Sequence, residues 1–244
     1  MRNAWIVARR ELGAIFVQPI AYIFTIVVVG ITGLIFAAQL ANYAIQPGVV
    51  PVDLANVLGT FTFLYIFAAP AITMRLLSEE QRSGTMELLM TLPLRDGEVV
   101  LGKFMAAFIF YMVATALTLV YPFVLIQFGN PDIGPILTSY LGVLLWGAGL
   151  LAIGLLASAL SDNQMVSFIL GFGLILVLYL AFIPGRFFTA SPTVALVFNE
   201  LSFESHLNNF MRGLILAKDV VYYLGITAVF LFATTRVLES RRWR

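Results

Sequence analysis

The sequence predicts an all-α membrane protein with six transmembrane helices. Of its 244 residues, 61% are hydrophobic and only 11% are charged, and the mean hydropathy is +0.97. Soluble domains carry about a quarter charged residues. Six long apolar runs divide the chain, and a helix needs about 20 apolar residues to cross a membrane. No polar stretch is long enough for a second domain, so we expect one transmembrane domain over residues 1–244.

The predicted spans follow the apolar runs. The first, residues 20–42, would cover about 34 Å at 1.5 Å per residue. Pro70 and Pro122 are expected to kink the second and third spans. The apolar core of each span lacks Asp, Glu, Lys and Arg, which argues against an ion-coupled mechanism because such carriers use ionisable groups at membrane depth. With their flanks, the six spans are residues 20–42, 54–77, 99–128, 136–160, 165–183 and 219–238.

Residues 1–18 are interrupted by charges and are not expected to span. They predict a helix lying in the membrane interface, with Arg9 and Arg10 toward anionic headgroups. The alternative is a flexible tail. A twin-arginine signal is not favoured, because the following apolar run is longer than a signal segment. The apolar residues at helical spacing are Trp5, Ala8, Leu12, Ile15 and Phe16.

Residues 78–93 form a polar segment between the second and third spans. Its second half predicts a short helix over residues 84–93, with Thr85 as a cap, Glu87 in the first turn and Pro93 at the end. Such a helix at the membrane surface would contact a partner in the aqueous phase. The alternative is an ordinary solvated loop.

The same segment resembles the cytoplasmic loop of ABC-2 type permeases, the membrane subunits of ABC exporters. Gly102 and Lys103 continue the likeness into the third span, and the residues from Asn208 to Arg244 extend it. Within the family, the sequence is most similar to the gliding-motility and copper-maturation permeases. The resemblance implies that 84–93 is a coupling helix that docks on an ATP-binding subunit. The residues it assigns to this contact are Glu80, Gly84, Thr85, Glu87, Leu88 and Leu89, followed by Pro93.

The resemblance therefore implies a permease subunit of an ATP-driven exporter, or of a machine that transmits force across the membrane. Its implied partners are an ATP-binding cassette subunit, a second permease copy or a homologous permease, membrane lipids, and a periplasmic accessory protein. Two other classes stay open: an ion-coupled carrier or channel, and a membrane scaffold without transport. Purification together with an ATPase would discriminate against both.

The sequence predicts no enzyme activity, cofactor site, metal site or nucleic-acid binding. Gly97–Phe104 nearly spells a Walker A loop, but Phe104 replaces the Ser or Thr that binds Mg²⁺, and no strand precedes it. The chain has no Cys, and His206 is its only His. A lone His lacks the neighbours of a metal site. ATP hydrolysis is therefore expected in a separate subunit.

Two further patterns concern packing. Residues 184–218 predict short helices outside the membrane, with Phe203, Leu207, Phe210 and Leu214 on one helical face. The fourth and fifth spans are rich in small residues, which allow helices to approach closely. These residues predict packing within the subunit or a seam between two copies; the pairs spaced four apart are Ala148/Ala152 and Gly154/Ser158.

The distribution of basic residues predicts the topology. With six spans, both termini and the 78–93 segment share one side. Of the 14 Lys and Arg residues, only Arg186, Arg212 and Lys218 fall on the other side, which leaves eleven. The positive-inside rule then places both termini and the segment in the cytoplasm, in a bacterial plasma membrane.

Cysteine labelling tests this topology, because the chain contains no native Cys. A single cysteine at position 84 should be protected from an impermeant reagent in intact cells, whereas one at position 200 should react. Labelling of position 84 from outside would refute the predicted orientation.

Overall fold

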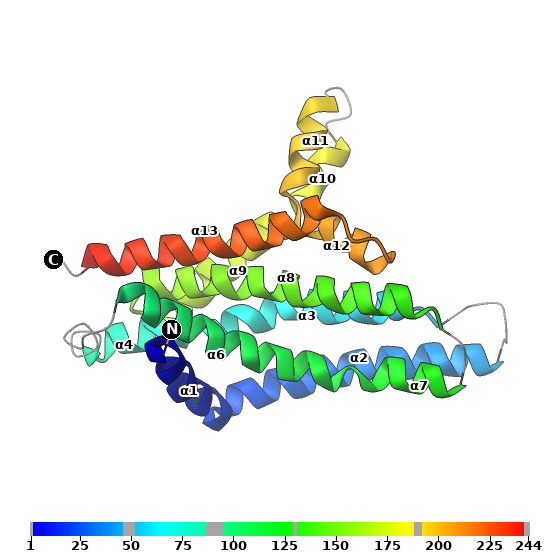
Figure 1. Ribbon diagram of the computed structural model, residues 1–244, viewed down its shortest axis with the longest axis horizontal. Helices are drawn as coiled ribbons and strands as arrows, with labels where there is room; N and C mark the ends of the chain where they lie inside the picture. The colour runs from blue at the N-terminus through cyan, green and yellow to red at the C-terminus, as the bar shows by residue number, and fades with distance from the viewer. Residues whose placement is uncertain (1, 46–51, 86–94, 129–130, 188–191, 242–244) are drawn as a thin grey trace.

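The chain folds into a bundle of α-helices. The computed structural model describes residues 2–45, 52–85, 95–128, 131–187 and 192–241, and these residues contain no β-strand. Figure 1 shows long helices packed side by side, with α4 and the C-terminus toward one end of the bundle. The helices are α1 (Arg2–Val17), α2 (Pro19–Ile45), α3 (Leu54–Thr73), α4 (Arg75–Arg82), α6 (Asp96–Leu117), α7 (Val120–Phe128), α8 (Ile133–Leu160), α9 (Gln164–Tyr179), α10 (Phe182–Phe187), α11 (Pro192–Leu201), α12 (Phe203–Met211) and α13 (Ala217–Arg241).

Within the described residues, six helical segments are long and apolar enough to cross a membrane. They confirm the predicted all-α class with six spans. The second segment joins α3 to α4, and the third joins α6 to α7. The six are Pro19–Ile45, Leu54–Arg82, Asp96–Gln127, Ile133–Leu160, Gln164–Pro184 and Ala217–Arg241.

Helix α8 is the centre of the bundle, and α3, α6, α9, α12 and α13 all pack against it. Its glycines admit large side chains from the neighbouring helices. A Cβ on Gly142 would lie 2.5 Å from the Cβ of Phe210, and one on Gly147 would lie 2.1 Å from the Tyr111 ring. Close approach within the subunit therefore accounts for these small residues of the fourth span. A seam between copies stays a prediction.

The third span is broken between α6 and α7, four residues before Pro122. A proline ring displaces the carbonyl of the residue four positions earlier, which here is Thr118. The Tyr140 hydroxyl of α8 donates a hydrogen bond of 2.9 Å to that carbonyl. The predicted kink is therefore present, and a neighbouring helix satisfies the backbone group that it frees.

The other end of the bundle carries α10, α11 and α12. Figure 1 shows α10 and α11 projecting away from the bundle, whereas α12 lies against it. Phe203, Leu207 and Phe210 are buried on one face of α12, as their spacing predicts, and Leu214 lies beyond the helix and is 52% exposed. Whether this end faces the cell exterior stays a prediction, as does the interfacial position of residues 1–18.

The packing at Gly147 can be tested by substitution. Gly147→Ala places a methyl group against the buried Tyr111 ring, so it should destabilise the protein by about 1–3 kcal/mol, the usual cost of overpacking. Gly173→Ala is the matched control, because a Cβ there meets no atom within 4 Å. The measurement is thermal unfolding of the purified protein in one detergent. Equal melting temperatures for the two variants would contradict the packing described here.

Candidate functional site

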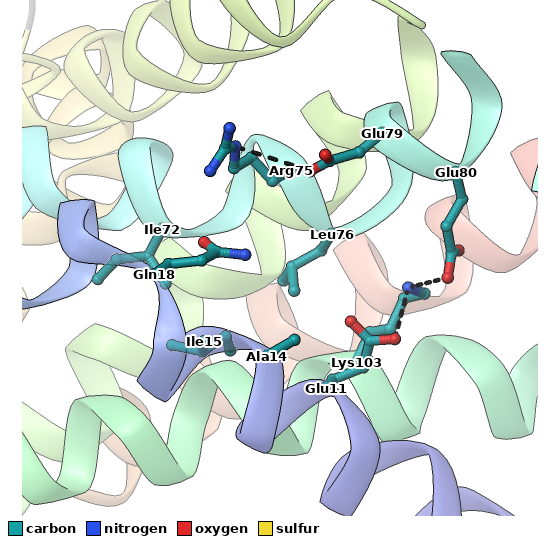
Figure 2. Close-up of a pocket in the computed structure, with 10 residues that line it drawn as sticks. All are labelled: Glu11, Ala14, Ile15, Gln18, Ile72, Arg75, Leu76, Glu79, Glu80 and Lys103. Atoms are coloured by element: carbon teal, nitrogen blue, oxygen red, sulfur yellow. Dashed lines mark ion pairs between the residues drawn. The ribbon is translucent and has the colours of Figure 1, made fainter. Parts of the chain in front are cut away.

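A buried charge network joins three helices at the α4 end of the bundle. Lys103 of α6 is fully buried, and its Nζ lies 2.9 Å from Glu80 Oε1 of α4 and 3.3 Å from Glu11 Oε1 of α1. Arg10 contacts the same two oxygens at 2.9 Å and 2.6 Å. Figure 2 shows Lys103 pointing between Glu11 and Glu80. The network therefore holds two cations and two carboxylates, and its formal charges cancel.

Burial makes this network sensitive to the loss of any one charge. An ammonium group removed from water is costly unless carboxylates pair with it, and deleting one partner of a buried pair typically costs about 3–5 kcal/mol. Arg10 is more exposed, and water screens its contribution. The hydrogen bond from Arg10 to Glu11 raises the pKa of Arg10. Partial burial opposes this rise, and the negative charges of Glu11 and Glu80 add to it. The guanidinium thus stays charged and can neutralise both acids.

Helix α1 is fixed along α6 by close packing as well as by charge. A Cβ on Gly102 would lie 2.7 Å from the Ala4 carbonyl oxygen, so only glycine leaves room for the α1 backbone. Asn3 also donates a hydrogen bond of 3.1 Å to Glu98 of α6. One face of α1, including Val7, is therefore buried against α6, and the opposite face, including Trp5, is exposed.

A break in the second span separates α3 from α4 at Met74. The Ser158 hydroxyl of α8 accepts hydrogen bonds from the Leu77 and Ser78 amides, at 3.0 and 3.1 Å, and donates one of 2.9 Å to the Met74 carbonyl. These groups would otherwise contribute to helical hydrogen bonds across the break. A side chain inserted into a helix in this way is a recognised cause of a kink. The sequence analysis expected the kink at Pro70; it lies four residues later, where Ser158 enters.

Helix α4 leads directly into the predicted coupling segment. Gly84 follows the helix with a φ of +71°, the left-handed conformation that ends many helices and favours glycine. The Thr85 hydroxyl lies 2.8 Å from the Ser83 hydroxyl, and Thr85 is exposed. Of the residues expected to bind a partner, the structure therefore describes Glu80, Gly84 and Thr85. Glu87, Leu88 and Leu89 lie outside the described residues, and the 84–93 helix stays a prediction.

A pocket of about 160 Å³ lies beside the network, between α1 and α4 (Figure 2). Glu79 and Arg75 line it on the α4 side, 3.7 Å apart, and Gln18 lines it on the α1 side. Arg75 also donates a hydrogen bond of 3.1 Å to Gln164 of α9. The pocket leaves space next to α4, so the helix is held mainly by polar contacts on this side.

The structure brings together residues that the sequence analysis kept apart. Glu80 was expected at the partner surface and Arg10 at the lipid headgroups, yet the two form an ion pair. Arg9 is exposed, and membrane contact by either arginine stays a prediction. Lys103, noted in the sequence only as part of the family likeness, is fully buried. The sequence analysis missed the roles of Lys103, Glu11 and Ser158. For Glu11 there was one available signal, because it is the only acidic residue among residues 1–18.

Comparison with known proteins gives one family match. A family model described as "ABC-2 family transporter protein" matches residues 5–241, which is nearly the whole chain. The matched region includes every residue of the charge network and the break at Met74. No curated protein matches the sequence.

The charge network predicts a specific pattern of stability. Lys103→Met leaves Glu11 and Glu80 with Arg10 as their only cation, so it should cost about 3–5 kcal/mol. A triple variant, Lys103→Met with Glu11→Gln and Glu80→Gln, removes the uncompensated acids and should recover much of that loss. Arg236→Met is the control, because its pair with Glu239 is exposed and should contribute about 1 kcal/mol or less.

Unfolding of the purified variants by denaturant measures these differences. If the single and triple variants lose the same free energy of unfolding, the Lys103 side chain contributes only through the packing of its methylene groups.

Proposed function

The chain belongs to the ABC-2 transporter family, and from that premise we propose that it is the membrane subunit of an ATP-driven exporter. Members of this family are membrane components that work with an ATP-binding cassette partner. In this proposal the partner hydrolyses ATP and the present chain forms the path across the membrane. Two permease copies, or this chain and a homologous permease, would enclose that path. Export is the direction that the family resemblance favours.

The observation that carries the proposal is the construction of α4. The helix begins at a break held by Ser158 of α8 and ends at Arg82, just before Gly84 and the segment expected to dock on the partner. Its middle carries Glu80, which pairs with Lys103 of α6 and Arg10 of α1. A push on residues 84–93 would therefore turn α4 about Met74 and act on α1 and α6 through charge.

Helix α8 would serve as the fixed element of this motion. It is the most buried of the six candidate spans, and it holds α4 at a second point, where the Gln81 side chain donates a hydrogen bond of 3.1 Å to the Ala159 carbonyl. Rigid helices that turn about a defined break are a common basis of conformational switching. Movement of α1, α4 and α6 against α8 would then open or close the path between subunits.

The buried charges fit this mechanism better than ion coupling. Lys103 lies near the start of α6, at the α4 end of the bundle, and Asp219 lies near the start of α13, at the other end. Each is paired with residues at its own end of the bundle. An ion-coupled carrier is expected to place ionisable groups along one path at membrane depth. Mechanical driving by a partner subunit accounts for the arrangement without such a path.

In the proposed orientation, both termini and α4 face the cytoplasm of a bacterium, where ATP is available. The basic residues counted above support it, because the α4 end receives most of them. A related proposal is that the subunit transmits force to a periplasmic protein rather than moving a substrate. The same break and charge network would serve either outcome.

The proposal predicts that the docking segment can be uncoupled from the bundle. The double change Leu88→Ala and Leu89→Ala truncates the apolar contact, and buried interface leucines typically contribute a few kcal/mol. We expect loss of the ATP-binding subunit on purification, or ATP hydrolysis without coupled transport. Leu196→Ala with Leu201→Ala is the matched control, because both leucines are exposed on α11.

The measurements are purification together with a co-expressed ATP-binding subunit and ATPase activity of the complex in proteoliposomes. Full partner binding and full coupled activity in the Leu88/Leu89 variant would place the docking site elsewhere.

A further inference from the structure

A second buried polar cluster lies at the opposite end of the bundle and has no part in the mechanism above. His206 of α12 and Asp219 of α13 are 3% and 0% exposed. The His206 Nδ1 lies 2.5 Å from Asp219 Oδ1, and the His206 Nε2 lies 3.0 Å from the Glu200 carbonyl oxygen at the end of α11. The Asn209 side chain donates a hydrogen bond of 2.8 Å to Asp219 Oδ2. One imidazole ring therefore links three helices.

Counting donors shows which protonation state of this cluster satisfies both contacts of the ring. A carboxylate oxygen and a carbonyl oxygen both accept hydrogen bonds, so each ring nitrogen of His206 faces an acceptor. A neutral imidazole has only one N–H and can satisfy only one of them. Both contacts become hydrogen bonds when the His206–Asp219 pair holds one more proton than a neutral histidine and a carboxylate would. An imidazolium also supplies the counter-charge that the buried Asp219 needs.

The extra proton acts on the elbow between α11 and α12. The Glu200 carbonyl belongs to the last turn of α11, where carbonyls lack helical partners and cations are favoured. The start of α13 holds the same elbow through other groups. Tyr222 donates a hydrogen bond of 2.6 Å to the Leu201 carbonyl, and Tyr223 donates one of 2.7 Å to the Phe203 carbonyl. Among these contacts to the elbow, the one from His206 Nε2 to the Glu200 carbonyl is a hydrogen bond only when Nε2 carries a proton.

We propose that His206 is a proton-dependent clasp that fixes α11 and α12 to the start of α13 and releases α11 when the proton is lost. Deprotonation would leave the Nε2 lone pair facing the Glu200 carbonyl, and two acceptors at that distance repel. The docked state binds one more proton than the released state, so docking is favoured by acid and weakens as the pH rises. For one proton, the ratio of docked to released molecules falls by up to about tenfold per pH unit.

Other titratable groups surround the clasp and have to be separated from it. Helix α11 contributes Glu200, whose carboxylate lies 3.8 Å from His206 Nε2 and 2.9 Å from Lys218 Nζ of α13. Helix α13 also contributes Tyr222, which stacks on the His206 ring at 3.9 Å, and Tyr223. Helix α12 contributes Glu204, and burial raises the pKa of that carboxyl group. Glu204 is therefore the neighbour whose titration most needs a control.

His206 is the only histidine of the chain, which makes the protonation state directly measurable. The full chain is labelled with ¹⁵N-histidine, purified without a histidine tag and reconstituted in lipid nanodiscs. At pH 5.5 the two ring nitrogens should give the paired signals of an imidazolium hydrogen-bonded at both positions, and these should convert to a neutral tautomer on titration to pH 9. Signals showing no proton on Nε2 at pH 5.5 would overturn the proposal.

Movement of the elbow is measured by spin labels at two exposed positions, Val197→Cys on α11 and Val221→Cys on α13. The distance between the labels should be narrowly distributed at acidic pH and broaden over the pH range in which the histidine titrates. Histidine titration without a change in distance would overturn the clasp.

Two variants assign the response to one residue. His206→Gln should give the broad distribution at every pH, and Glu204→Gln should respond like the unmodified sequence. A pH response that survives His206→Gln, or that disappears in Glu204→Gln, would refute the role of His206. None of these measurements depends on the ATP-binding partner, so failure here leaves the proposed transport function untouched.

Discussion

The packing at one end of the bundle depends on the burial of a single ammonium group. Lys103 has no exposed surface, so α1 and α4 must each deliver a carboxylate to it. That requirement fixes three helices against one another, although Arg10 is the only member of the network with substantial access to water. At the two helix breaks, Ser158 and Tyr140 form hydrogen bonds to buried backbone groups. Apolar packing builds the bundle, and these polar contacts set where its helices bend.

The two polar clusters divide the molecule into ends with different properties. At the α4 end, a lysine and an arginine pair with two glutamates. At the α12 end, the pairing relies on a histidine, and the proposed clasp makes it depend on a proton. The two proposals follow this division: a charge-paired linkage where force from a partner would enter, and a proton-dependent linkage at the opposite end of the bundle. The central helix α8 lies between the ends and packs against elements of both.

The sequence predicts most of the fold because membrane burial imposes a simple rule on composition. Six apolar runs specify six helices, and the pattern of Phe203, Leu207 and Phe210 specifies the buried face of α12. Pairings across the chain are harder to predict: nothing local to Lys103 indicates that Glu11, far earlier in the sequence, will reach it. The kink near Pro70 was misplaced because its position depends on Ser158 of another helix. For the candidate site, the sequence singled out Glu80 and Gly84 as partner contacts, which stays a prediction, and it did not indicate the charge network around Glu80.

The order of the paired charges along the chain has a consequence for how the protein is made. Glu11 and Glu80 both precede Lys103, and His206 and Asn209 both precede Asp219. Chains are synthesised and begin to fold from the N-terminus. Each charge that ends fully buried therefore leaves the ribosome after its partners, and it can be neutralised as it enters the bilayer. Biosynthesis in this order removes the need for any stage at which Lys103 or Asp219 waits in lipid without a counter-charge.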